Sequence, residues 1–193
     1  NVRHANELGL KSIAITDHGP GHMICGIKRE NFVRLKEEVE LARAEFPHMN
    51  IYTGVEANIV DLDGTLDITD KDLEFFDVIL MGYHEMVGAK SLKMAGLITA
   101  NLAGRLLNIK GARSRQANTK AFIKAIERYP IDAITHIGCK LEVDEYEIAK
   151  AAAQNNTLIE INTKHISDAS PLLNTFETDC SYLISSDAHH PTS

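Results

Sequence analysis

Short apolar runs recur along the chain, and each is followed, directly or after a loop, by a stretch with helical spacing. Runs of this length are typical of buried strands, because helices need longer amphipathic segments. Strands that alternate with helices predict a parallel sheet with crossover helices. The expected strands are 12–16, 51–55, 77–81, 131–135, 157–161 and 182–185.

Helical periodicity predicts the intervening elements. The clearest amphipathic segment is 114–128, for which Ser114 is the expected N-cap. Between residues 58 and 68, Asp63-Gly64 stands between apolar flanks and predicts a tight hairpin. The other expected helices are 2–8, 30–46, 92–107, 143–154 and 170–176.

Six strands without a dinucleotide glycine fingerprint favour an α/β barrel over an open doubly wound sheet. The chain has 193 residues, 44% of them apolar, which is enough for one sizeable core. No repeat, linker or low-complexity stretch interrupts the pattern. We therefore expect a single domain over residues 1–193.

Composition narrows the function classes. A formal net charge of −7 disfavours attraction of nucleic acid by the surface as a whole. Three widely spaced cysteines fit a reducing compartment and argue against a disulfide framework. No apolar run approaches the ~20 residues of a membrane span, and no signal-peptide pattern is present. We expect a cytoplasmic protein that does not bind membranes; nothing in the pattern specifies an oligomeric state.

Nine histidines are many for this length, and their positions suggest chemistry. Barrel enzymes carry their reactive residues at the C-terminal ends of strands, where all strands converge. Imidazole and carboxylate together suit Zn, Mn or Fe, and a bound metal can activate water for hydrolysis. The residues that follow the expected strands directly are Asp17, His18, Glu56, His84, His136, Asp187 and His189.

Each of these residues also has an ordinary explanation. A lone histidine after a strand, such as His136, is more often a core or capping residue than a ligand. His84 has a better case, since Gly82 allows close backbone approach. Asp187 and His189 would share one face of an extended segment. Several such strand ends in one chain favour a metal cluster over coincidence.

Other polar residues are candidates for substrate contact. His22 lies in a glycine-flanked loop and could line a pocket, and His165 and His190 could touch substrate. The stretch 90–115 has a positive balance, which is either a solvated face or a grip on a substrate phosphate. Its cations are Lys90, Lys93, Arg105, Lys110, Arg113 and Arg115.

The motifs together resemble the PHP (polymerase and histidinol phosphatase) family, in order and spacing across nearly the whole chain. They look closest to its small stand-alone phosphatases. The segments that carry the resemblance are Ile-Ala-Ile-Thr-Asp-His-Gly-Pro at 13–20, Gly-Val-Glu-Ala-Asn at 54–58, Gly-Tyr-His-Glu at 82–85, Thr-His-Ile-Gly at 135–138, Leu-Ile-Glu-Ile-Asn at 158–162 and Ser-Asp-Ala-His at 186–189.

The resemblance implies a distorted (β/α)7 TIM-like barrel with two or three divalent metals at its mouth. It implies that His18 and His189 hold one metal. Glu56 would bridge two others, with His84 and His136 on one and Asp187 on its partner. Asp17 would orient a ligand or take part in proton transfer, so Asp17 and Asp187 are the expected catalytic residues.

The family's first motif, a His-x-His, is absent from the chain. The resemblance therefore implies a fragment that lacks the first strand, the last helix and three ligands. The function it predicts is hydrolysis of a small phosphate ester by metal-activated water. Two alternatives stay open: a nucleic-acid-directed exonuclease or polymerase-associated domain, and a degenerate metal-binding domain without activity.

Overall fold

The described part of the chain, residues 1–107, 111–164 and 170–188 of a computed structural model, forms a six-stranded sheet. Every neighbouring pair is parallel, and the strand order across the sheet follows the chain. All six predicted strands are therefore confirmed. They are β1 (Ser12–His18), β2 (Asn50–Asn58), β3 (Val78–Gly82), β4 (Ala133–Ile134), β5 (Leu158–Asn162) and β6 (Tyr182–Ser185).

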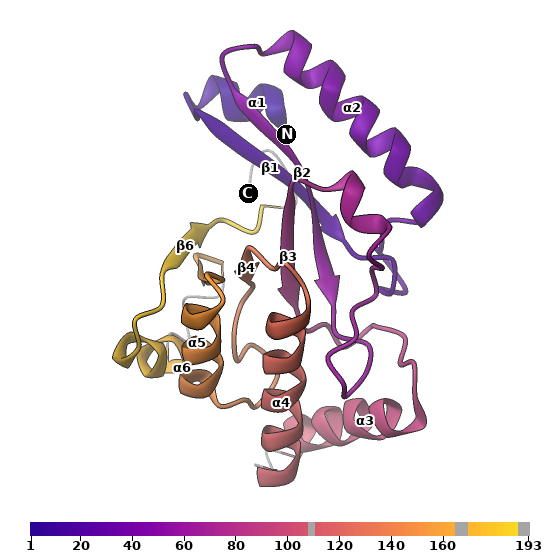
Figure 1. The fold of residues 1–193 in the computed structure, drawn as a ribbon, viewed down its shortest axis with the longest axis vertical. Coiled ribbons are helices and arrows are strands. Elements are labelled where there is room, and N and C mark those ends of the chain that lie inside the picture. The colour runs from indigo at the N-terminus through magenta and orange to yellow at the C-terminus, as the bar shows by residue number, and fades with distance from the viewer. Residues whose placement is uncertain (108–110, 165–169, 189–193) are drawn as a thin grey trace.

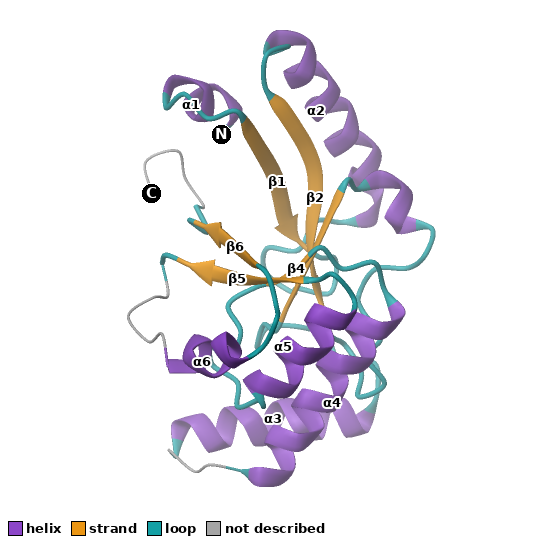
Figure 2. Cartoon of the chain, turned by 60° about the vertical axis from the view of Figure 1, so that its left-hand side comes forward, coloured by secondary structure: helices purple, strands orange, loops and turns teal. Residues whose placement is uncertain are grey.

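The sheet is strongly curled. In Figure 2, β5 and β6 run across the direction of β1 and β2. Within the described residues, β1 and β6 are the two edges of an open sheet and do not pair with each other. The predicted α/β fold with a curled parallel sheet is thus confirmed. The seventh strand and the closure of the expected barrel are not seen in these residues.

Helices occupy the crossovers between strands, except that the connection from β2 to β3 holds the hairpin and a 3₁₀ turn. Figure 1 shows α2 alongside β1 and β2, with α3, α4 and α5 gathered toward the opposite end of the molecule. The helices are α1 (Val2–Glu7), α2 (Phe32–Glu45), α3 (Leu92–Leu106), α4 (Ala112–Arg128), α5 (Glu145–Gln154) and α6 (Ser170–Leu173). Single 3₁₀ turns cover Arg29–Asn31, Asp72–Phe75 and Asn174–Glu177.

The starts of α4 and α5 differ from the prediction. The amide of Arg115 already donates to Gly111 O at 2.9 Å, so α4 begins at Ala112 with Gly111 as its N-cap. The expectation that Ser114 caps this helix was wrong, because the alanine and arginine before it continue the helical turn. Helix α5 starts later than expected, because the Asp144 side chain caps it by accepting from Glu147 N at 3.3 Å.

The core lies between the sheet and its helices. Val55 and Ala57 of β2, Ile134 of β4 and Ile159 of β5 are inaccessible to solvent, and so is Ile148 of α5. Burying each of the larger aliphatic side chains contributes about 1.5–3 kcal/mol. This core fixes the strands, and through them the positions of the residues at their C-terminal ends.

The predicted hairpin is confirmed. Ile59 and Leu66 form an antiparallel bridge, and Val60 N donates to Thr65 O at 2.9 Å. Gly64 has φ +80°, a conformation that favours glycine, and a Cβ there would meet the α4 backbone at Ala125 N. The hairpin therefore packs closely on α4.

In the part of the chain that the structure describes, no helix has the length and apolar character needed to cross a membrane.

Candidate metal centre

Glu56 is the centre of a histidine cluster at the C-terminal edge of the sheet. Its carboxylate is buried, and Oε1 accepts a hydrogen bond from Thr135 Oγ1 at 2.7 Å. Three imidazoles face it: His18 Nδ1 lies 3.2 Å from Oε2, and Oε1 lies 3.6 Å from His84 Nε2 and 3.1 Å from His136 Nε2. Four successive strands thus bring four predicted site residues together.

The cluster places potential ligand atoms at the spacing of a metal site. One atom each from His18, Glu56 and His84 lie within 4.8 Å of one another. The His84 ring meets the rings of His18 and His136 edge-on, with centroid separations of 4.5 Å and 5.0 Å. Two imidazoles and one carboxylate are a donor set that suits Zn, Mn or Fe.

Their environment sets the protonation of these groups. Burial raises the pKa of Glu56, but the hydrogen bond from His136, the charges of His84 and His136 and the Thr135 hydroxyl outweigh it and lower the pKa to about 2. Burial is the main cause that lowers the pKa of His84 to about 4, against the attraction of Glu56. At neutral pH, an ionised carboxylate and a neutral imidazole are the forms that bind metal.

His136 has the opposite shift. Burial lowers its pKa, but its hydrogen bond to Glu56 and the negative charges of Glu56, Glu160 and Asp187 outweigh burial, so its pKa is raised. Without a metal, a proton on His136 is stabilised by the surrounding carboxylates. A metal at this position would replace that positive charge.

Gly82 allows the side chains of the cluster to pack closely against the backbone. A Cβ on this residue would overlap Thr135 Oγ1 and would lie 3.0 Å from Glu56 Oε1 and 3.1 Å from His136 Cε1. The close backbone approach expected at Gly82 is confirmed. Glycine here is required by contact with the cluster.

Two site residues have left-handed backbones. His136 has φ +31°, and its amide donates to Glu160 Oε2 at 2.6 Å. Glu160, buried on β5, also accepts from Ser185 Oγ at 2.5 Å and so ties β6 to the site. Asp187 has φ +50°, so the segment that contains it is not extended there, contrary to the sequence prediction. Its Oδ2 lies 3.6 Å from Lys164 Nζ.

A buried polar network behind His84 escaped the prediction. Asn58 Oδ1 lies 2.7 Å from His84 Nδ1, and Asn58 Nδ2 donates to Asp67 Oδ2 at 2.7 Å. Burial raises the pKa of Asp67, although its hydrogen bonds with Asn58 and Gly21 oppose that shift. Strand alternation could have identified Asn58, because it lies two residues beyond Glu56 on the same face of β2. Asp67 lies in the hairpin, and no local sequence pattern marks it as a residue of the site.

The cluster lines a cavity of about 360 Å³. His22 stacks on His18 with a centroid separation of 4.8 Å, which places it in the pocket as predicted. Burial and the neighbouring His18 lower the pKa of His22. Met86, Lys140 and Asp187 also line this cavity.

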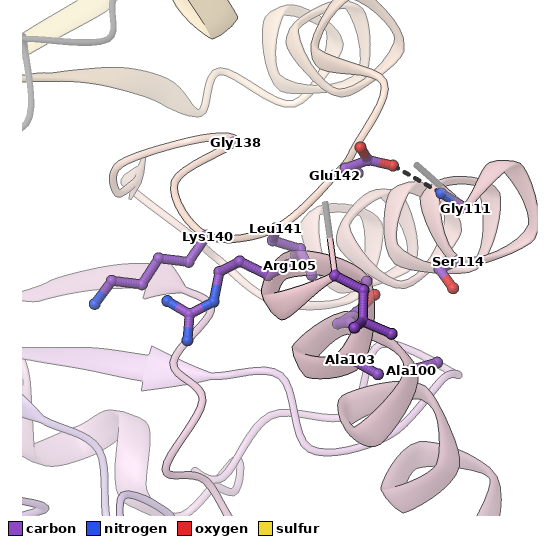
Figure 3. Close-up of a pocket in the computed structure, with 12 residues that line it drawn as sticks. Ala100, Ala103, Arg105, Gly111, Ser114, Gly138, Lys140, Leu141 and Glu142 are labelled. Carbon is purple, nitrogen blue, oxygen red and sulfur yellow. Dashed lines mark hydrogen bonds between the residues drawn. The ribbon is translucent and has the colours of Figure 1, made fainter. Parts of the chain in front are cut away.

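A second cavity of about 370 Å³ lies between α3, the start of α4 and the segment after β4. Small residues and leucines line much of it, and Lys140 belongs to both cavities. Figure 3 shows the Arg105 and Lys140 side chains extending in the same direction. Arg105 also pairs with Glu85, a residue of the first cavity, at 2.9 Å. The two cavities are therefore neighbours.

The remaining predicted residues fall outside this arrangement. Asp17 is exposed and pairs in register with Val55, so alternation directs it to the sheet face opposite His18 and Glu56. It does not line either cavity. His165, His189 and His190 lie outside the described residues.

Comparison with known proteins gives relatives that are named as phosphatases. A "probable phosphatase" of Tolumonas auensis is 31% identical over 167 residues, which span 83% of this chain and 55% of the relative. The "probable phosphatase YcdX" of Shigella flexneri serotype 5b is 29% identical over 162 residues with the same shares. The chain thus spans about half the length of these relatives. No family model matches it.

Solved structures share the fold. The histidinol phosphate phosphatase of Lactococcus lactis, solved with zinc, L-histidinol and phosphate, superposes with a TM-score of 0.62 at 16% identity, over 98% of this chain and 79% of that one. A chain from Listeria monocytogenes gives a TM-score of 0.65 at 11% identity, over 99% and 88%. These likenesses support the curled α/β architecture.

Proposed function

We propose that this chain is part of a PHP-family phosphoesterase that hydrolyses a small phosphate ester with a divalent metal centre. The observation that carries the proposal is the buried Glu56 carboxylate faced by three imidazoles, His18, His84 and His136, at the ends of successive parallel strands. The relatives named as phosphatases agree with this chemistry.

The proposed ligands begin with the three residues whose donor atoms converge, His18, Glu56 and His84, which would hold one ion. His136, 3.1 Å from Glu56, and Asp187, which lines the same cavity, would hold a second together with Glu56. We assign His189 as a further ligand from its sequence motif. When bound, Zn, Mn or Fe would lower the pKa of a water molecule and stabilise charge on the phosphoryl oxygens.

The protein's own groups would bind and orient the substrate. Lys140 lines the metal cavity and makes no ion pair with any described residue, so its ammonium group is available to a phosphate oxygen. His22 lies in the same cavity and can donate a hydrogen bond to the ester. Asp187 remains the proposed proton acceptor. Exposed Asp17 lines neither cavity, so we do not propose a catalytic role for it.

The test is hydrolysis of an aryl phosphate by the complete protein with added Mn²⁺ or Zn²⁺. Glu56→Gln and His84→Ala are each expected to lower kcat/KM by at least a hundredfold, because each removes a ligand of the cluster. His48→Ala is the matched control, since this exposed histidine lies away from the cluster and bonds to Asn6. Activity that survives the Glu56 and His84 substitutions together would disprove the proposal.

A further inference from the structure

The imidazole of His84 lies between two acceptors. Its Nδ1 is 2.7 Å from Asn58 Oδ1, and its Nε2 is 3.6 Å from Glu56 Oε1. A neutral imidazole carries one N–H and one lone pair, so only one ring nitrogen can bind a metal. Which one does so depends on the hydrogen bond that the other makes.

The orientation of the Asn58 amide is fixed by its second contact. Asn58 is completely buried, and its Nδ2 donates to Asp67 Oδ2 at 2.7 Å. Reversing the amide would set its carbonyl oxygen against a carboxylate oxygen, two acceptors without a proton between them. The carbonyl of Asn58 therefore faces His84, and the proton between them belongs to Nδ1 of His84.

Asp67 is itself held by backbone donors. Its Oδ1 accepts from Asn58 N at 2.9 Å, and Oδ2 accepts from Gly21 N at 2.8 Å. A Cβ on Gly19 or Gly21 would come within 2.5 to 2.9 Å of the carboxylate oxygens, so the loop after β1 approaches through glycine. The hairpin after β2 and the loop after β1 thus fix the orientation of the Asn58 amide.

We propose that Asn58, oriented by Asp67, is a positioning residue that keeps the His84 proton on Nδ1 and turns the Nε2 lone pair toward the metal centre. The metal-binding part of this inference rests on the proposed function, whereas the tautomer does not. Partners of this kind commonly contribute 10–100-fold to metal affinity by fixing the tautomer and ring orientation of a ligand.

The tautomer is measurable in the metal-free protein by ¹H–¹⁵N correlation spectra of the histidine rings. The His84 signals are assigned as those lost in His84→Gln. Wild type is expected to show the Nδ1–H tautomer, and Asn58→Ala is expected to move His84 toward the Nε2–H form. A wild-type spectrum with His84 in the Nε2–H form would overturn the inference without any need for the variant to fold.

Zinc affinity is the second readout, measured by titration against a chelating indicator. Asn58→Ala is expected to weaken Zn²⁺ binding about 10–100-fold, and Asp67→Asn to weaken it in the same direction. Asn118→Ala is the matched control, because Asn118 is also buried and hydrogen-bonded, to Asn101 and Glu142 O, but lies away from His84. It is expected to cost stability and to leave both the tautomer and Zn²⁺ affinity unchanged.

The two proposals fail in different ways. A wild-type protein that binds no Zn²⁺ contradicts the proposed function. Wild-type Zn²⁺ affinity in Asn58→Ala, with His84 still in the Nδ1–H form, contradicts the role of Asn58 and leaves the proposed function intact.

Discussion

At the scale of single residues, Gly82 is where backbone and cluster meet most closely. Gly82→Ala would force a methyl group against Thr135 Oγ1, Glu56 Oε1 and the His136 ring. We expect it to lower the free energy of unfolding by about 1–3 kcal/mol, the usual cost of overpacking, and to weaken Zn²⁺ binding. Urea denaturation and zinc titration measure the two effects.

Gly96 supplies the control. It lies exposed in α3, and an added Cβ would meet nothing within 4 Å. Gly96→Ala is expected to raise stability by up to ~1 kcal/mol, because alanine loses less conformational entropy in a helix. If Gly82→Ala were as harmless as Gly96→Ala, the tight packing inferred for the cluster would be wrong.

Substitution of Lys140 can test substrate binding without removing an ion pair of the fold. It is exposed, has φ +59° and makes no ion pair within the described residues, in contrast to Lys164, which pairs with Asp187. Lys140→Gln removes the charge and is expected to raise KM for an aryl phosphate about tenfold, the loss of ~1.4 kcal/mol of binding. Steady-state kinetics measure it, with exposed Lys150→Gln as the control; equal KM values would exclude a phosphate contact.

The residues at strand ends could be predicted because they follow apolar runs directly. His18, Glu56, His84 and His136 come together as expected, since parallel strands end at one edge. Asp17 was grouped with His18 by adjacency, yet neighbouring residues of a strand face opposite ways. Asp67 and Glu160 act through contacts 9 to 46 residues apart in the chain, which no local pattern reveals.

At the scale of elements, Asp77 joins β2, β3 and α2. Its Oδ2 accepts from Thr53 N at 2.9 Å, Thr53 Oγ1 at 2.8 Å and Arg43 Nη2 at 2.7 Å. Burial raises the pKa of Asp77, but these hydrogen bonds outweigh it and lower the pKa below its usual value. The ionised carboxylate therefore stabilises the fold.

The sign of the pH dependence follows from that lowered pKa. The contribution is complete above the unfolded pKa of about 3.9 and disappears as the pH falls through the lower folded pKa. Asp77→Ala is expected to cost about 1 kcal/mol at pH 7, allowing for partial exposure of the pair, and much less at pH 2–3. Denaturation across this range tests it, with exposed Asp70→Ala as the control; a cost independent of pH would contradict the assignment.

Element boundaries were predictable where a strand stays extended to its end and less so where the backbone geometry changes. Strand β6 was predicted residue for residue, whereas β4 is reduced to Ala133–Ile134. At the C-terminal end of β4, the backbone leaves the extended conformation at His136, whose amide turns toward Glu160. The same turn that shortens β4 places the His136 ring on Glu56, and apolar periodicity carries no information about it.

At the scale of the whole molecule, the parallel direction of the strands followed from the alternation of strands and helices, and the expected barrel implied a curled sheet. The detailed shape of that curl could not be predicted. Curl depends on how each strand packs on the next across long crossovers. It brings the ends of β1 through β4 around one carboxylate. The cluster therefore joins segments that are distant in sequence.

A metal bound to such a cluster must stabilise the whole fold, because the unfolded chain cannot assemble the site. Free metal at a thousand times its Kd contributes ~4 kcal/mol, which for a domain of this size corresponds to a rise in Tm of about 10 °C. We expect Zn²⁺ or Mn²⁺ to raise Tm by this order and EDTA to reverse it. In Glu56→Gln, which keeps the shape of the side chain, the rise is expected to vanish while the variant still folds. A rise of equal size in Glu56→Gln would place the metal elsewhere, since the strand ends converge on that carboxylate.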